Sequence, residues 1–155
     1  MQSKFERFME YEYLRYDGVN GLGKHLLFTD TRYDILIAHH YPLDCLQYDY
    51  LPDYQTYCDV QKKYNRRIKR LYEHMEECNS ILFIREGGNL EEIEELHALL
   101  SKLVKGRFVL VVVNWIQSDA IYEERTSLEN VCFLSFDLLN IERWKEVLDG
   151  VSLKE

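Results

Sequence analysis

The chain has 155 residues, of which 46% are hydrophobic and 30% are charged, and its formal net charge at pH 7 is −8. This length and composition predict one globular domain over residues 1–155. The acidic balance disfavours a general nucleic-acid binder, which needs a basic surface. No run approaches the roughly 18 apolar residues that a membrane span requires.

The N-terminus reads MQSKFERFMEYEY, which is mixed in charge and has no continuous apolar segment, so a secretory signal is not expected. The four cysteines are scattered and have no C-x-x-C spacing; they are Cys45, Cys58, Cys78 and Cys132. Reduced thiols in a cytoplasm are therefore expected. No histidines or cysteines have the spacing of metal ligands, so neither a metal nor another cofactor is predicted.

The first third of the chain is rich in tyrosine, since nine of the twelve tyrosines lie between Tyr11 and Tyr57. The stretch SKFERFMEYEYLRY, residues 3–16, has aromatic residues and a methionine at helical spacing, which predicts a helix. The glycines that follow are expected to end it.

Two short apolar runs come next, HLLF at residues 25–28 and YDILIAHH at residues 33–40. The polar connection TDTR between them predicts a β-hairpin. After it, PLDCLQYDYLP at residues 42–52 lies between the only two prolines and predicts an irregular, tyrosine-rich loop. Loops of this length in compact domains often carry function.

The rest of the chain alternates helices with continuous apolar strands. In chain order these are a helix over 53–77, a strand over 80–84, a helix over 89–106, strands over 107–115 and 130–136, and a helix over 138–150. Asp53 is expected to cap the first helix, and Asn89 with Glu92 to form a capping box on the second. The alternation predicts an α/β fold, namely a three-layer, mostly parallel, Rossmann-like sheet with the antiparallel N-terminal hairpin at its edge.

The segment YDILIAHHY followed by YNRRIKRLYEHMEECNSILFIREGGN resembles an uncharacterised bacterial family of putative papain-like cysteine peptidases, a domain of unknown function. The resemblance covers about residues 28–100 and rests on a strand that ends in histidine, a helix with an Arg-Arg pair and a strand reading ILFIR. It implies that His39 is the partner of a cysteine on a Ser-Leu-Gly turn nearer the N-terminus. This chain has no such turn and no cysteine before Cys45. The resemblance therefore predicts a member without its own nucleophile.

A catalytic hypothesis within this chain uses His39 as the general base for the Cys45 thiol, with Asp44 or Asp34 orienting the imidazole. Neighbouring residues on a strand point to opposite faces, so His39 and His40 serve one site only if the strand ends before them. The alternative is one buried, hydrogen-bonded histidine and one exposed histidine.

A ligand-binding hypothesis places an anion at the turn FIREGGNLEE, where Arg85, Gly87 and Gly88 precede a helix N-terminus. Asn114 and His39 fall at the same rim if the second strand of the hairpin runs parallel with the others, because ligands in open α/β sheets bind at the carboxyl ends of strands. His40 is counted among the ligand-binding residues as well. The alternative is an ordinary Gly-Gly turn in which Arg85 pairs with a neighbouring acid.

The stretch KKYNRRIKR, residues 62–70, is either a patch for an anionic partner or a solvated helix face. Two functions from different classes stay open. The first is a cysteine-peptidase-like hydrolase; the second is a non-catalytic binding module that uses the tyrosine-rich third and forms a homodimer. The expected partner is a small molecule or a peptide, with no nucleic acid and no membrane.

Overall fold

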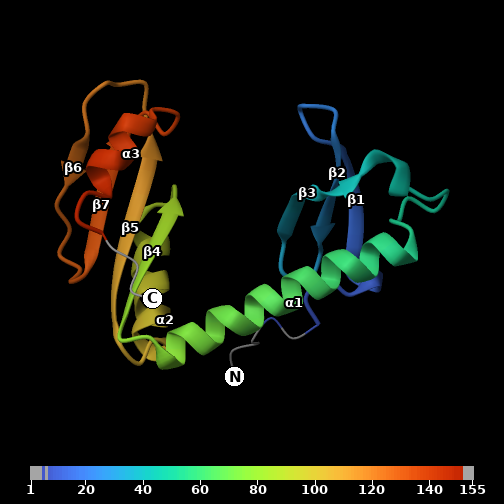
Figure 1. Ribbon diagram of the computed structural model, residues 1–155, viewed down its shortest axis with the longest axis horizontal. Coiled ribbons are helices and arrows are strands. Elements are labelled where there is room, and N and C mark those ends of the chain that lie inside the picture. Colours follow the sequence, from blue (N-terminus) through green and yellow to red (C-terminus); the bar gives the residue numbers. More distant parts are fainter. Residues whose placement is uncertain (1–4, 6, 152–155) are drawn as a thin grey trace. The chain divides into compact units, whose positions relative to one another are not determined.

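The structure, a computed structural model, describes residues 5 and 7–151, and its contacts divide the chain into two compact units, Met1–Leu71 and Tyr72–Glu155. Each unit has its own sheet (Figure 1). The fold is therefore mixed α/β with two sheets, and the prediction of one continuous sheet is wrong. The single domain over residues 1–155 stays a prediction.

The first unit holds an antiparallel sheet in the order β1-β2-β3. Its strands are β1 (Leu14–Val19), β2 (His25–Asp30) and β3 (Ile35–Pro42), with the 3₁₀ turns η1 (Tyr11–Tyr13) and η2 (Leu43–Cys45) on either side. The helix α1 (Tyr54–Glu77) begins in this unit and contributes Tyr57 and Val60 to its core. These side chains pack in one apolar cluster with Phe28, Ile37 and Tyr41 of the sheet.

The predicted hairpin is confirmed, since β2 and β3 pair antiparallel. Its predicted place at the edge of the parallel sheet is wrong, because β1, β2 and β3 form a sheet separate from the one that contains β4, β5 and β7. Strand β1 occupies part of the segment for which a helix was predicted. Tertiary contacts thus decide the conformation of this segment.

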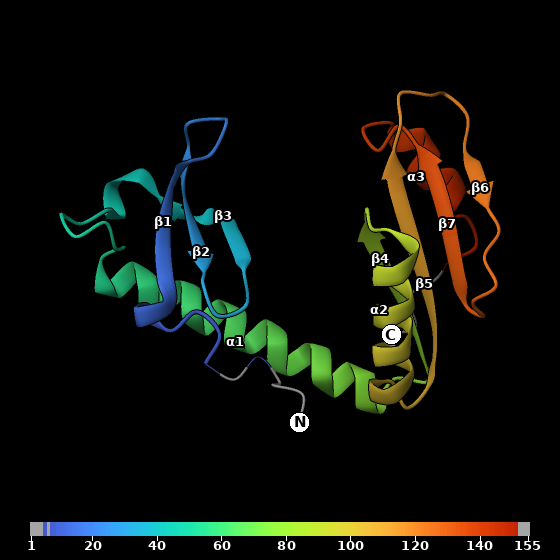
Figure 2. The same ribbon diagram turned by 180° about the vertical axis from the view of Figure 1, so that it is seen from behind.

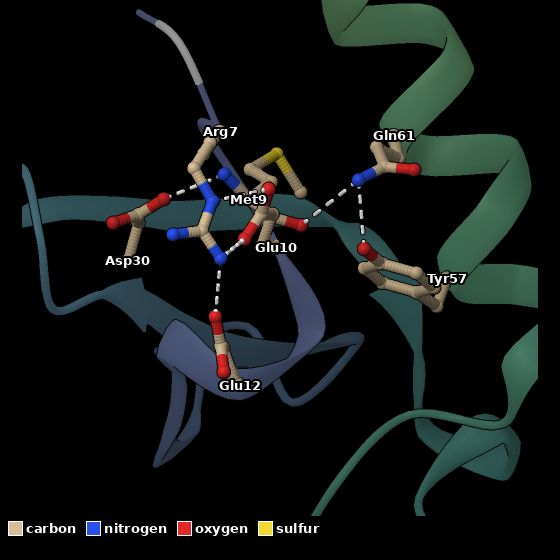
Figure 3. A network of polar contacts seen from close by, with 7 residues as sticks. All are labelled: Arg7, Met9, Glu10, Glu12, Asp30, Tyr57 and Gln61. Carbon is tan, nitrogen blue, oxygen red and sulfur yellow. Dashed lines mark hydrogen bonds and ion pairs between the residues drawn. The ribbon is translucent and has the colours of Figure 1, made fainter.

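The helix predicted over residues 3–16 is absent from the described part of that segment, where Arg7 and Met9 have φ angles of 62° and 59°. A left-handed conformation ends a right-handed helix at once. The segment is held by long-range contacts instead, because Met9 is fully buried and its backbone N–H donates to Asp30 Oδ2 over 2.6 Å. The Arg7 guanidinium bonds Glu10 and Glu12 on the exposed side (Figure 3).

The second unit holds a four-stranded sheet in the order β4-β5-β7-β6. Its elements are β4 (Ser80–Glu86), α2 (Leu90–Leu103), β5 (Arg107–Trp115), β6 (Tyr122–Glu124), β7 (Val131–Phe136) and α3 (Ile141–Val147). Strands β4, β5 and β7 run parallel, and β6 pairs antiparallel with β7. The helices and the parallel strands are those predicted, whereas the short, exposed β6 has no apolar pattern to reveal it.

Apolar clusters lie on both faces of this sheet, which explains why β5 is a continuous apolar run. Leu110 and Val112 pack in one cluster with Ile93 of α2. The alternate residue Val113 packs in the other, with Trp144 of α3. Figures 1 and 2 show α2 and α3 from opposite sides of the sheet.

The predicted helix caps are confirmed. The Asn89 side chain accepts from the Glu92 N–H, and the Glu92 carboxylate accepts from the Asn89 N–H. Asp53 Oδ1 accepts from the backbone N–H groups of Gln55 and Thr56 at the start of α1. Within the described residues, no helix is both long and apolar enough to cross a lipid bilayer.

Candidate functional site

Cys45, the candidate nucleophile, lies in η2 directly after β3, and its side chain is buried with 3% of its surface exposed. Burial raises the pKa of the Cys45 thiol to about 11, and the nearby carboxylates of Asp53 and Asp44 raise it further. A thiolate nucleophile requires the opposite environment, a cation or imidazolium beside the sulfur. The Asp44 side chain is exposed, so it adds negative charge near the thiol without orienting a histidine against it.

His39 and His40 divide between two environments. The exposed His39 ring packs edge-on against His25 of β2, with 6.1 Å between ring centroids. His40 is half-buried; its Nδ1 accepts from Lys63 Nζ over 3.1 Å and its ring packs on Tyr64. In the described part of the chain no hydrogen bond joins either histidine to Cys45. The arrangement is that of the alternative interpretation, one packed and one exposed histidine.

A thiol–imidazole contact exists elsewhere, between His74 Nδ1 and Cys78 Sγ, which lie 3.4 Å apart at the C-terminal end of α1. This contact was not predicted, although a spacing of four residues on a helix places two side chains on one face. The C-terminal end of a helix carries partial negative charge, which opposes ionisation of a thiol. The pair is a local contact at the end of a helix.

Arg85, which precedes the Gly-Gly turn at the end of β4, is already paired with a nearby carboxylate. Arg85 Nη2 donates to Glu92 Oε2 over 3.1 Å, and the capping box occupies the N-terminus of α2. Gly87 and Gly88 have φ angles of 70° and 125°, which a residue with a side chain adopts only under strain. This geometry favours the alternative interpretation, a strand-to-helix turn with a paired arginine.

The residues predicted to share one rim belong to different sheets. Arg85 lies on β4 and the half-buried Asn114 on β5, whereas His39 and His40 lie on β3 of the antiparallel sheet. The premise that Arg85, Asn114 and His39 end strands of one sheet is wrong. Among residues 5 and 7–151, no group of three or more His, Cys, Asp or Glu side chains is placed to hold a metal ion.

An open pocket of about 500 Å³ lies in the first unit and was not predicted as a site. Its lining is aromatic and acidic: Tyr11, Gln47, Tyr48, Asp49, Asp53 and Tyr54. The sequence signal was present in the tyrosine-rich loop 42–52, but only the fold brings Tyr11 to it. The Tyr11 hydroxyl donates to the Pro52 carbonyl over 2.9 Å, which fixes one wall of the pocket.

Negative charge is built into this pocket. Burial raises the pKa of the Tyr11 hydroxyl, and the carboxylates of Asp49 and Asp53 raise it further, so both carboxylates act on the pocket wall. Hydrogen bonds from the Thr56 side chain and from backbone N–H groups lower the pKa of Asp53. Asp53 therefore stays ionised at neutral pH.

Comparison with protein-family models found a match to the family described as "Putative papain-like cysteine peptidase (DUF1796)", over residues 1–118. The match confirms the resemblance seen in the sequence and extends it to more of the chain. Searches of curated proteins and of solved structures each found no match. The matched residues include the antiparallel sheet, α1, and the strands β4 and β5.

Proposed function

The chain belongs to the family of putative papain-like cysteine peptidases, and from this premise we propose that it acts as a non-catalytic binding module. Thiol catalysis needs a nucleophile and a base within hydrogen-bond reach. Cys45 is buried with a raised pKa, and Cys78 contacts His74 at the unfavourable end of a helix. These environments support a protein that binds a ligand without cleaving it.

The binding surface in this proposal is the pocket of the first unit. The observation that carries it is the presence of three tyrosines and two aspartates around one opening of about 500 Å³. Tyr48 and Tyr54 are exposed, and tyrosine gives a large contact area at a low cost in conformational entropy. The exposed rings of Tyr48 and Tyr54 lie next to two carboxylates, and such amphipathic aromatic surfaces are common in binding interfaces.

The side chains that line this pocket favour a positively charged ligand. Aromatic faces attract ammonium and guanidinium groups, and the carboxylates of Asp49 and Asp53 add direct charge complementarity. Neither lysine nor arginine lines the pocket to compete for these groups. We therefore propose that the ligand is a peptide that inserts a lysine or arginine side chain between the tyrosines.

A titration followed by NMR tests this proposal. Nα-acetyl-lysine amide is expected to shift amide resonances of residues 47–54, and the norleucine analogue, which lacks the ammonium group, is not. Asp49→Asn should weaken binding by about fivefold, the effect of roughly 1 kcal/mol of charge attraction at a surface. Tyr48→Ala should weaken it by about two- to fivefold, the effect of about 0.5–1 kcal/mol from an exposed cation–π contact.

Tyr122→Ala is the matched control, since Tyr122 is an exposed tyrosine on β6 in the other unit. It should leave the affinity unchanged. Equal binding of the lysine and norleucine derivatives would remove the basis for a cation site. Equal weakening by Tyr48→Ala and Tyr122→Ala would remove the basis for this pocket.

For the second unit we propose the three-layer, Rossmann-like arrangement. The apolar clusters on the two faces of the sheet, one with α2 and one with α3, support it. The parallel register of β4, β5 and β7 supports it as well.

A further inference from the structure

We propose a second site of opposite charge in the first unit, where Lys63 and Arg67, beside His40, bind a phosphate group. These three residues are called the cationic cluster below. The inference goes beyond the binding of a cationic peptide side chain, since it concerns a different surface and a different class of ligand.

An irregularity in the hairpin lies where His40 contacts α1. Leu26 pairs with Tyr41 and Phe28 pairs with Ile37, so three residues of β3, numbers 38–40, lie opposite Leu27 alone. Extra residues of this kind redirect side chains from the regular alternation of a strand. His39 contacts His25 on the neighbouring strand, while His40 contacts α1.

The helix α1 provides the permanent charges. Lys63 Nζ lies 3.1 Å from His40 Nδ1, and the His40 ring lies edge-on to Tyr64 with 5.2 Å between centroids. Arg67 Cζ lies 5.9 Å from the centroid of the same Tyr64 ring. Lys63, His40, Tyr64 and Arg67 are therefore linked by successive side-chain contacts.

The positive charges of this surface have no internal counter-ion. In the part of the chain that the structure describes, neither Lys63 nor Arg67 forms an ion pair with a carboxylate, whereas Lys62 on the same helix pairs with Asp59. Burial lowers the pKa of His40, and the charges of Lys63, Arg67, His39 and His25 lower it further. Among the described residues, no carboxylate is one of the main influences on the His40 pKa, although the chain as a whole carries a net charge of −8.

The donor groups match a phosphate dianion. An ammonium cannot accept a hydrogen bond, so Lys63 donates to His40 Nδ1, and the Nε2 side of the ring points away from Lys63. Lys63 keeps two further N–H donors, and the guanidinium of Arg67 has the fork geometry that suits phosphate oxygens. Two fixed positive charges balance the dianion.

The test is an NMR titration of the whole chain with inorganic phosphate and with sulfate, which stays a dianion across the pH range. We expect amide shifts around His40, Lys63 and Arg67, and a higher His40 pKa in the presence of either anion. Sulfate should bind more tightly at about pH 6 than at about pH 8, because protonated imidazoles add positive charge. Uridine monophosphate is the third probe: tighter binding than phosphate assigns the site to monoesters, and equal binding assigns it to the phosphate group alone.

Lys63→Met and Arg67→Met should each weaken sulfate binding by about tenfold, the effect of one charge-assisted hydrogen bond. Lys62→Met is the matched control, with the same charge change one residue away, and should weaken it less than twofold. Arg67 is exposed, so its variant tests the site even if the half-buried Lys63 affects folding. Equal weakening by Lys62→Met, or shifts spread evenly over the surface lysines, would overturn the proposal.

Discussion

The backbone N–H of Met9 donates to the buried carboxylate of Asp30 over 2.6 Å, and this contact ties the N-terminal segment to β2 (Figure 3). Asp30 also accepts from the backbone N–H groups of Arg32 and Tyr33, which closes the turn between β2 and β3. On the other side of the segment, Gln61 of α1 donates to the Met9 carbonyl and to the Tyr57 hydroxyl. The Asp30 carboxylate thus joins the N-terminal segment, β2 and the turn after β2, and Gln61 joins the same segment to α1.

Replacing Asp30 with alanine should lower the free energy of unfolding by about 3 kcal/mol, because it leaves buried N–H groups without an acceptor. Chemical denaturation followed by circular dichroism measures the change. Asp44→Ala is the control, since that carboxylate is exposed, and it should change stability by less than about 0.5 kcal/mol. Similar losses in the two variants would contradict the role assigned to Asp30.

The Tyr41 hydroxyl is buried in the core of the first unit and has no hydrogen-bond partner among the described residues. Removing it in Tyr41→Phe should therefore raise the free energy of unfolding by about 1 kcal/mol. Tyr57→Phe should lower it by a similar amount, because that hydroxyl accepts from Gln61 Nε2 over 2.7 Å. Thermal unfolding of the two variants provides the comparison, and a loss of stability in both would show that Tyr41 has a partner.

Cys45 should be nearly unreactive in the folded protein. With a pKa of about 11, roughly one Cys45 thiol in a thousand is ionised at pH 8, and burial also restricts access by a reagent. Iodoacetamide at that pH should alkylate the half-exposed Cys78 well before Cys45, as mass spectrometry of the tryptic peptides would show. Rapid alkylation of Cys45 near pH 6 would instead support a peptidase-like thiol.

The pKa of His40 should depend on Lys63. Burial and the Lys63 ammonium favour the neutral imidazole, so Lys63→Met should raise the His40 pKa and Lys62→Met should leave it unchanged. Proton NMR of the imidazole signals across pH 5–8 measures both variants. An equal response of His40 to the two substitutions would contradict a local effect of Lys63.

The same lowered pKa makes stability depend on pH. In the folded chain His40 binds its proton less readily than in the unfolded chain, so the unfolded state takes up more protons as pH falls below the ordinary value of about 6.5. The His40 contribution is therefore fully present above that pH and is lost as pH falls through the folded pKa. His40→Gln should flatten this part of the stability profile.

Gly106 packs against the backbone where β4 begins. A Cβ at this position would collide with the carbonyl oxygens of Cys78 and Asn79, which cannot move as a flexible side chain can. Gly106→Ala should therefore cost about 2 kcal/mol of stability. Gly21→Ala meets open space and should cost nothing measurable by denaturation; equal effects would contradict the close packing.

Local signals were sufficient for the helices and the parallel strands of the second unit. The capping box of Asn89 and Glu92, the apolar stripe of α2 and the continuous run of β5 each depend on residues within one element. The family could also be recognised from the sequence, because the resemblance rests on contiguous motifs, and the family match over residues 1–118 confirms the family. The position of Asp53 as a helix cap followed from local spacing in the same way.

The sites depend on contacts between residues far apart in the chain, which periodicity does not reveal. The pairing of β1 with β2 separates His39 from the sheet of Arg85, and the meeting of Tyr11 with the loop 42–52 creates the acidic pocket.

By itself, then, the sequence determined the helices and parallel strands of the second unit and the hairpin, because local interactions between neighbouring residues favour them. It also determined the family, because the motifs of the family are contiguous in the chain. Only the tertiary structure decided that the N-terminal segment forms β1, that Cys45 is buried and that Lys63 meets His40. The physical reason is that burial and long-range hydrogen bonds outweigh helix propensities of less than about 1 kcal/mol per residue.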